Sequence, residues 1–450
     1  MKRKSLLFTG VLFLLVVLVV GISREQRVQA TGETYDQLNI FSEVLHLVQQ
    51  NYVEDVDTKK MIYGAVKGML DALDPHSTFM EPDTYKELQV DTRGKFGGIG
   101  IQIALRDKQL TIIAPIEDTP GDKAGLKSGD VIVKVDNQWT KDMSLMDAVK
   151  LMRGEPGTDV TLTIMRKGFK KPRNFAITRA IIKVKSVKHK VMEQEIGYIR
   201  LSQFQQGSSK EVENALKKLL KEGQVNSIIL DMRNNPGGLL DEAVEISGKF
   251  LPKGTLVVYT KGRTQDRSDY KVTGDYDIPR VPMVVLVNGG SASASEIVSG
   301  ALQDWGRAIV MGTQTFGKGS VQTVVPLSDG SGLRLTTAKY YTPRDKSIQN
   351  VGIAPDIVVE ERLVVKNGDS AAHRLKEADL KNHLDNPEMD EENGLTIPDG
   401  SEPRGVQDMD ANGDEPEESP EAKDYQLQEA ISLLKAWKVF EEKKPLFETR

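Results

Sequence analysis

The sequence predicts a multidomain α/β protein, in which a layered α/β core carries an inserted strand-rich module and has helical parts at both ends. Three patterns lead to this fold class. Helical periodicity covers residues 35–72 and returns near the C-terminus, short strand-like runs fill about residues 96–179, and strands alternate with helices over about residues 196–359. With 450 residues, the chain is long enough for two or three domains, each with its own hydrophobic core.

Residues 1–30 have the pattern of an export signal. Three cations at positions 2–4 precede an apolar run from Leu6 to Ile22. A positive flank followed by such a run directs the rest of the chain out of the cytoplasm. A membrane-spanning helix needs roughly 17–25 apolar residues, so the pattern fits both a cleaved signal peptide and a membrane anchor. We therefore expect an extracytoplasmic protein of a bacterium, anchored to the cell membrane or secreted.

Residues 33–92 are predicted to form a helical N-terminal region. Phe41, Val44 and Val48 recur at helical spacing, and the pattern ends at Asp74-Pro75-His76-Ser77, a helix stop followed by a turn. Residues 93–182 change character, with short strands such as 99–104 and 160–165 and one helix at 143–152. This composition predicts a small mixed α/β or barrel-like module.

Residues 190–362, joined by residues 75–92, are predicted to form the layered core. Its apolar runs and helical patterns alternate, which favours strands crossing over through helices. The predicted strands include 196–201, 227–232, 283–287 and 333–341, and the predicted helices are 209–221, 239–250 and 293–305.

The C-terminal part combines an acidic stretch with a last helix. Residues 384–422 are rich in Asp, Glu, Pro and Gly, with 14 acids against one base between Asp385 and Glu421, and we expect a disordered linker. Residues 423–445 are predicted to form a helix with Leu427, Ile431 and Leu434 on one stripe. We expect that stripe to pack on the N-terminal helices or on a partner chain.

The segment from Asn288 to Glu296, N-G-G-S-A-S-A-S-E, follows a buried strand and opens a helix. A serine in such an elbow is lifted clear of the sheet, and the helix N-terminus offers free amides to a developing oxyanion. Ser293 and Glu296 also have the spacing of a capping box, so helix capping is an alternative for this segment.

The segment from Asp231 to Gly238, D-M-R-N-N-P-G-G, also runs from a strand into a helix. Successive glycines allow backbone amides to converge on an anion. A plain turn, with Asn234 or Asn235 capping the helix, is the alternative.

The segment from Phe316 to Gln322, F-G-K-G-S-V-Q, places a lysine between two glycines before a strand. Lys318 can act as a base only where burial lowers its pKa from about 10.4 toward neutrality. The chain has no cysteine, and none of its five histidines lies in the α/β elements between Ile196 and Val359. A lysine is therefore the best available activator of a serine, and an exposed turn lysine is the alternative.

These three segments, in this order, resemble those of the C-terminal processing peptidases, or tail-specific proteases. The resemblance implies Ser293 as nucleophile, Lys318 as base and Gln322 as its support. The oxyanion-hole role falls to Gly237, Gly238 and Ala294. Two flanking motifs, Leu73–Ser77 and Gly352–Asp356, match the family as well. The family's core is crotonase-like, built from ββα units, and the resemblance implies this fold here.

The module over residues 93–182 resembles a PDZ domain. Gly98, Ile99, Gly100 and Ile101 stand where PDZ domains place the loop that binds a free C-terminal carboxylate. We expect Arg153 to relay occupancy of this loop to the active site.

The resemblance implies an exported serine peptidase that cuts protein substrates near free, apolar C-termini, gated by the PDZ domain. We expect no metal, no cofactor and no nucleic-acid partner. The expected contacts are with the membrane, through an uncleaved N-terminal segment, and with a second copy, through the terminal helices. A catalytically silent PDZ scaffold and a crotonase-type enzyme acting on acyl thioesters stay open, although the export signal disfavours the latter.

Overall fold

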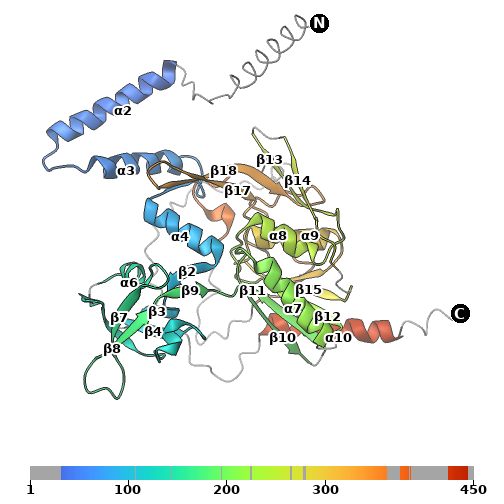
Figure 1. Cartoon of the computed structure of the whole chain (residues 1–450). Helices are drawn as coiled ribbons and strands as arrows, with labels where there is room; N and C mark the ends of the chain where they lie inside the picture. The colour runs from blue at the N-terminus through green and yellow to red at the C-terminus, as the bar shows by residue number, and fades with distance from the viewer. Residues whose placement is uncertain are drawn as a thin grey trace, which may run out of the picture. The chain divides into compact units, whose positions relative to one another are not determined.

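A computed structural model describes residues 32–361, 375–386 and 424–443, apart from residues 107, 142, 194, 223–224, 264–265, 277–279 and 385 (Figure 1). The chain divides into two units, residues 1–66 and 67–450. The predicted export signal and nearly all of the predicted acidic linker lie outside the described residues. Within the described ranges, no helix is long and apolar enough to cross a bilayer.

The first unit holds helix α2 (Gly32–Asn51) and the start of helix α3 (Thr58–Asp71). Asp57 begins α3, because its carboxylate accepts the Lys60 amide at 3.1 Å. The apolar side of α2 is largely exposed, with Leu38 at 53% and Val44 at 54%. Helix α2 therefore carries exposed apolar side chains.

Residues 95–183 form the predicted strand-rich module. Its six-stranded sheet has the order β3-β4-β5-β7-β8 with β6 beside β5, and β2 pairs with β9. Ile132, Leu162 and Ala148 are fully buried between this sheet and α6. The elements are β2 (Lys95–Gly98), β3 (Ile101–Arg106), β4 (Gln109–Pro115), α5 (Pro120–Lys123), β5 (Val131–Val135), β6 (Gln138–Trp139), α6 (Leu145–Met152), β7 (Asp159–Met165), β8 (Arg173–Thr178) and β9 (Ala180–Lys183).

The core contains a six-stranded sheet of order β10-β11-β12-β15-β16-β19, parallel from β11 onward. Every residue of β12 and β15 is buried, because helices cover both faces. The strands are β10 (Val187–Met192), β11 (Ile196–Leu201), β12 (Ser227–Asp231), β15 (Met283–Val287), β16 (Ile309–Gly312) and β19 (Ile357–Val358). The crossover helices are α7 (Ser208–Glu222), α8 (Leu240–Gly248) and α9 (Ala294–Asp304).

A second, antiparallel sheet has the order β1-β18-β13-β14, with β17 also paired to β18. Its strands are β1 (Thr78–Met80), β13 (Leu256–Gly262), β14 (Ser268–Lys271), β17 (Ser320–Pro326) and β18 (Gly332–Tyr341). Helix α4 (Pro82–Arg93) follows β1 and leads into the strand-rich module. Within the segment 75–92, β1 thus adds a strand to this sheet by pairing with β18.

The last helix, α10 (Tyr425–Lys443), corrects one prediction. Its apolar stripe packs on the core sheet (Figure 1), whereas the sequence predicted that it would cover the N-terminal helices or a partner chain. Ala430, at 0% exposure, and Ile431 join the cluster that contains Ile229 and Val284 from β12 and β15. Alternate residues of these strands face α7–α9 on one side and α10 on the other. This face of the parallel sheet is apolar and must be buried, but nothing in the sequence of the helix identifies the sheet as the surface it covers.

Candidate active site

Ser293 stands in a sharp turn between β15 and α9, after the carboxyl end of β15. Its φ of 54° and ψ of −110° lie in a region that residues other than glycine rarely adopt. Hydrogen bonds to the loop after β12 hold the turn. The Ser291 hydroxyl donates to the Met232 carbonyl (2.8 Å), and the Ala292 amide donates to the Asn235 carbonyl (3.0 Å). Backbone strain that the surroundings maintain is typical of functional sites.

Helix capping accounts for Glu296 but not for the backbone of Ser293. Glu296 Oε2 accepts the Ser293 amide at 2.7 Å, which is the carboxylate half of a capping box. An ordinary N-cap residue has extended backbone angles, whereas Ser293 has a positive φ. The conformation therefore favours the elbow interpretation, with capping by Glu296 as part of it.

The Glu296 side chain joins the serine turn to the lysine loop. Besides Ser293, its Oε2 accepts the Lys318 amide (3.0 Å), while Oε1 accepts the Thr315 hydroxyl (2.6 Å) and the Gly317 amide (2.7 Å). Glu296 is completely buried. Burial raises the pKa of Glu296 to about 7, against the four hydrogen bonds, which lower it. One carboxylate oxygen thus holds the backbones of both predicted catalytic residues.

Lys318 is half-buried, and its surroundings favour the neutral amine. Burial lowers the pKa of Lys318, and the positive charge of Arg334 lowers it further. The carboxylates of Glu377, Glu296 and Asp74 act in the opposite direction and are outweighed. A lysine accepts a proton only from its neutral form, so this environment suits a general base.

Gln322, on β17, is linked to the Asp74 turn. Its amide nitrogen donates to the Ser320 hydroxyl (2.9 Å) and, at 3.4 Å, to the Thr336 hydroxyl. Thr336 in turn donates to Asp74 Oδ1 (3.0 Å). These bonds fix Gln322 in the sheet that carries the lysine loop, and its support of Lys318 stays a prediction.

Gly237 packs directly against the serine turn, whereas Gly238 packs against the Phe204 backbone. A Cβ on Gly237 would lie 2.8 Å from the Ala292 carbonyl oxygen and 3.0 Å from the Ala294 nitrogen. The Gly237 amide donates to Asn235 Oδ1 at 2.9 Å. Among the described residues, the amides of Gly238 and Ala294 have no backbone acceptor. These two amides therefore keep the predicted oxyanion-hole role as a prediction, and Gly237 provides the close approach between the two segments.

His76 and Glu377 belong to the surroundings of the site, although neither stood out as a site residue in the sequence. His76 Nε2 lies 2.8 Å from both carboxylate oxygens of Glu377, which is fully buried. The Leu73–Ser77 motif pointed to the His76 turn, but only as a family signature. No local pattern marks Glu377, because its partners are 301 residues away or contributed by other loops.

The predicted carboxylate-binding loop, Gly98–Ile101, connects β2 to β3 in the PDZ-type module. The Ile99 carbonyl accepts the Gly121 amide (2.7 Å), and the Gly100 carbonyl accepts the Ile116 amide (2.9 Å). These bonds fix the carbonyls toward the module's interior.

Arg153 ends helix α6 beside the strand that leads into this loop. Its guanidinium lies 4.8 Å from the centroid of the Phe96 ring, and the next residue, Gly154, donates its amide to the Gly97 carbonyl (3.1 Å). Arg153 is thus positioned to respond to changes in the loop, and its relay to the active site stays a prediction.

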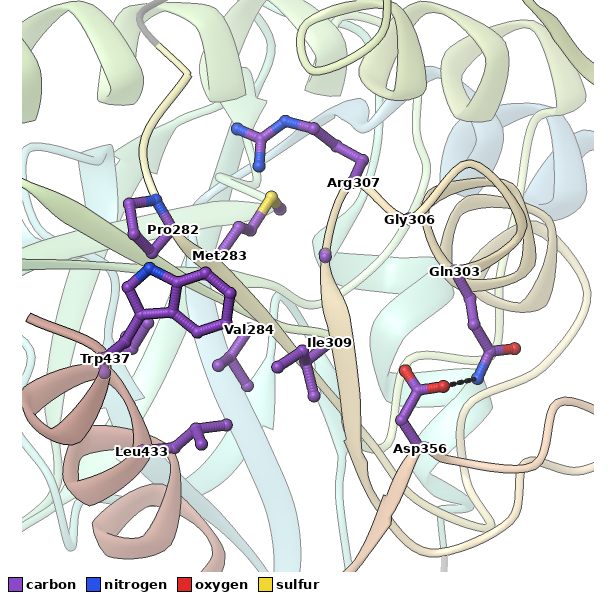
Figure 2. Close-up of a pocket in the computed structure, with 12 residues that line it drawn as sticks. Pro282, Met283, Val284, Gln303, Gly306, Arg307, Ile309, Asp356, Leu433 and Trp437 are labelled. Carbon is purple, nitrogen blue, oxygen red and sulfur yellow. Dashed lines mark hydrogen bonds between the residues drawn. The ribbon is translucent and has the colours of Figure 1, made fainter. Parts of the chain in front are cut away.

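A cavity of about 350 Å³ lies at the amino ends of β15 and β16, beside α10 (Figure 2). Met283 and Ile309 form one side of it, and Leu433 and Trp437 of α10 form another. Open α/β sheets bind their substrates beyond the carboxyl ends of the strands. Ser293 lies at that other end, so we do not assign the chemistry to this cavity.

Three domain families match successive parts of the chain. Residues 20–84 match the N-terminal domain of the activating protease CtpB, residues 97–177 match the PDZ domain, and residues 195–359 match peptidase family S41. The S41 match covers the segments that carry Ser293, Lys318 and the two glycines.

Curated relatives extend the similarity over most of the chain. A carboxy-terminal-processing protease of Bartonella bacilliformis is 44% identical over 393 residues, which cover 85% of this chain and 88% of the relative. A carboxyl-terminal-processing protease of Synechocystis sp. is 41% identical over 326 residues, covering 71% and 76%. Among solved structures, a photosystem II D1 C-terminal processing protease is 33% identical, covering 74% of this chain and 94% of that one, with a TM-score of 0.43.

The comparisons confirm the predicted family, fold class and enzyme class. The strand–turn–helix elbow, the buried lysine loop and the PDZ-type module all lie within matched regions. The chain therefore belongs to peptidase family S41, among the carboxy-terminal-processing proteases, which are serine-type hydrolases that carry a PDZ domain.

Proposed function

We propose that Ser293 and Lys318 form a catalytic dyad that cleaves protein substrates near their C-termini. The observation that carries this proposal is the shared hydrogen bonding of both backbone amides to Glu296 Oε2. It ties a strained serine turn to a lysine whose pKa is lowered by burial. Gln322 supports the lysine from β17, the strand that begins two residues after Lys318.

In this mechanism, neutral Lys318 takes the proton of the Ser293 hydroxyl while the serine oxygen attacks the peptide carbonyl. The amides of Gly238 and Ala294 stabilise the oxyanion, and Gly237, which precedes Gly238 in the turn after β12, contributes to the same site. Lys318 then gives its proton to the leaving nitrogen. Water attacks the acyl-enzyme, passes a proton through Lys318 back to Ser293, and releases the second product.

The PDZ domain supplies the substrate. Its Gly98–Ile101 loop captures a free C-terminal carboxylate, and the peptide adds a strand beside β3. The neighbouring Arg153 links occupancy of the loop to activity. This arrangement selects protein chains with free, apolar C-termini.

We further propose that the enzyme works outside the cytoplasm. The positive flank and apolar run of residues 1–30 direct its export, and the run tethers it to the membrane where it is not cleaved. The exposed apolar side of α2 supports pairing with a second copy through the N-terminal helices. The apolar stripe of α10 is already used within the chain.

The test uses the full chain in detergent and an unstructured protein with an apolar C-terminus. Wild type should cleave it, and both Ser293→Ala and Lys318→Ala should abolish cleavage. Amidating the substrate's C-terminus should raise KM, because the loop then loses its carboxylate. Undiminished cleavage by either alanine variant would contradict the dyad. Binding without cleavage by wild type would favour a silent PDZ scaffold instead.

A further inference from the structure

Residues 375–386, described except for 385 and here named the clamp segment, pack against the lysine loop. They follow the S41-matched region, which ends at residue 359. The Glu377 amide donates to the Phe316 carbonyl (3.2 Å), two residues before Lys318. At the other end of the segment, the Asn386 side chain donates to the Gln349 carbonyl (3.0 Å). A segment outside the matched core thus contacts the loop that carries the base.

The Glu377 carboxylate is the centre of this contact. Its side chain is 0% exposed and pairs with His76 at 2.8 Å. Gln349 Nε2 donates to Glu377 Oε1 (3.1 Å), and Gln349 Oε1 accepts the Gly319 amide (3.1 Å). A chain of side chains therefore runs from His76 through Glu377 and Gln349 to the residue that follows Lys318.

The peptide groups around Lys318 are consequently held by two buried carboxylates. Glu296, from α9, accepts the amides of Gly317 and Lys318. Glu377 binds the Phe316 carbonyl through its own amide and reaches Gly319 through Gln349. A buried carboxylate costs free energy unless hydrogen bonds compensate it. Glu377 is the second buried carboxylate beside the Lys318 loop, and the dyad mechanism gives it no role.

We propose that Glu377, held by His76, is a positioning residue that fixes the Lys318 loop through Gln349 and places a negative charge near the lysine amine. This inference rests on the proposed role of Lys318 as the base. It assigns to the clamp segment a part in catalysis that the motifs of the S41 region do not include.

The charge on Glu377 is one of several that act on the Lys318 amine. Lys318 is surrounded by Arg334 from β18, Asp74 from the turn before β1, Glu296 from α9 and Glu377 itself. The Arg334 guanidinium also donates to the His76 carbonyl (3.1 Å). Removing the Glu377 charge leaves burial and Arg334 less opposed, so the amine loses its proton at lower pH.

Two conservative variants of Glu377 separate the effect of its charge from the effect of its side-chain length. Glu377→Gln keeps the length and an acceptor for Gln349 but loses the charge. Glu377→Asp keeps the charge but shortens the side chain. Asp379→Asn is the matched control, because it removes a carboxylate charge from the same short helix at an exposed position and keeps an oxygen that can accept the Lys376 amide.

The experiment measures kcat and KM from pH 5 to 9 on the full chain in detergent, with the unstructured test protein as substrate. For Glu377→Gln, the acidic limb of kcat/KM should move to lower pH. For Glu377→Asp, kcat at the plateau should fall about tenfold or more, with KM changed less than about twofold, because the loop is misplaced. Asp379→Asn should match wild type.

Thermal unfolding of each variant shows that the fold is kept. An acidic limb of Glu377→Gln that coincides with wild type would overturn the inference, even if kcat fell, since a purely structural role leaves the limb in place. So would an unchanged kcat in Glu377→Asp. Activity retained by Lys318→Ala would instead reject the dyad, which keeps the two failures distinguishable.

Discussion

Substituting Gly237→Ala tests whether the glycine turn and the serine turn act as one packed unit. Gly237 has a φ of 99°, and a Cβ there would lie 2.8 Å from the Ala292 carbonyl oxygen and 3.0 Å from Ser293 Cβ. Both neighbours belong to the short turn that presents the nucleophile. The added methyl group therefore cannot be accommodated by a side-chain rotation and must displace backbone.

The expected size of the effect has two parts. A positive φ in a non-glycine residue costs about 1–2 kcal/mol of stability. Displacement of the serine turn by a fraction of an ångström to 1 Å reduces the rate about 10²-fold, since catalytic groups tolerate little misplacement. We therefore expect kcat to fall about 10²-fold, and the free energy of unfolding to fall by about 1–3 kcal/mol.

The matched control is Gly254→Ala in the same domain. Gly254 has a φ of 84°, but a Cβ there would meet nothing within 4 Å. This variant should lose about 1–2 kcal/mol of stability from the backbone alone, with kcat unchanged. The assay combines urea denaturation with steady-state cleavage of the test protein. Equal kcat values for the two variants would refute the idea that contact between the turns, rather than stability, positions Ser293.

Three more results are expected. Lys318→Met should abolish cleavage yet raise the free energy of unfolding at pH 7 by about 1 kcal/mol, as removal of a destabilised functional group often does. Burial lowers the pKa of Lys318 in the folded state below its ordinary value of 10.5, so between the folded-state and unfolded-state pKa values the unfolded chain binds more protons. The free energy of unfolding of wild type should therefore rise with pH over that interval, and urea denaturation should show a smaller rise for Lys318→Met. Glu296→Gln should lower kcat about 10²-fold at unchanged secondary structure, because an amide leaves part of the four donors unpaired; near-wild-type kcat would argue against its role. Ala430→Asp should lower the free energy of unfolding by about 3 kcal/mol or more, and the urea midpoint with it, since it buries a carboxylate under the sheet; an unchanged midpoint would mean that α10 does not dock there.

The limits of the strands and the helix around the proposed catalytic residues were predicted to within about one residue from the sequence. The apolar run 283–287 coincides with β15, and the predicted helix 293–305 differs from α9 by one residue at each end. Strands covered on both faces are apolar throughout, so their limits are visible where polar residues resume. The same reasoning placed β12, one residue shorter than predicted.

Long-range partners could not be predicted in the same way. The stripe on α10 indicated that the helix must be covered, but an apolar stripe fits any apolar surface of suitable shape. The pair of His76 and Glu377 joins a turn before β1 to a short helix after β19. No periodicity or spacing relates two residues that meet only when the fold is complete.

The choice between capping and catalysis at Ser293 was undecided in the sequence because both use the same residue types at the same spacing. In the structure, Glu296 supplies a capping interaction, and the catalytic role of Ser293 stays our proposal. Glu296 satisfies the orphan amide of Ser293, and the same oxygen accepts the Lys318 amide. In most helices such a capping interaction only stabilises the helix end. In this protein it also fixes the distance between the Ser293 turn and the Lys318 loop. The positive φ of Ser293 is the local rule that the motif breaks, and positions where a local rule is broken at the expense of stability are where function is expected.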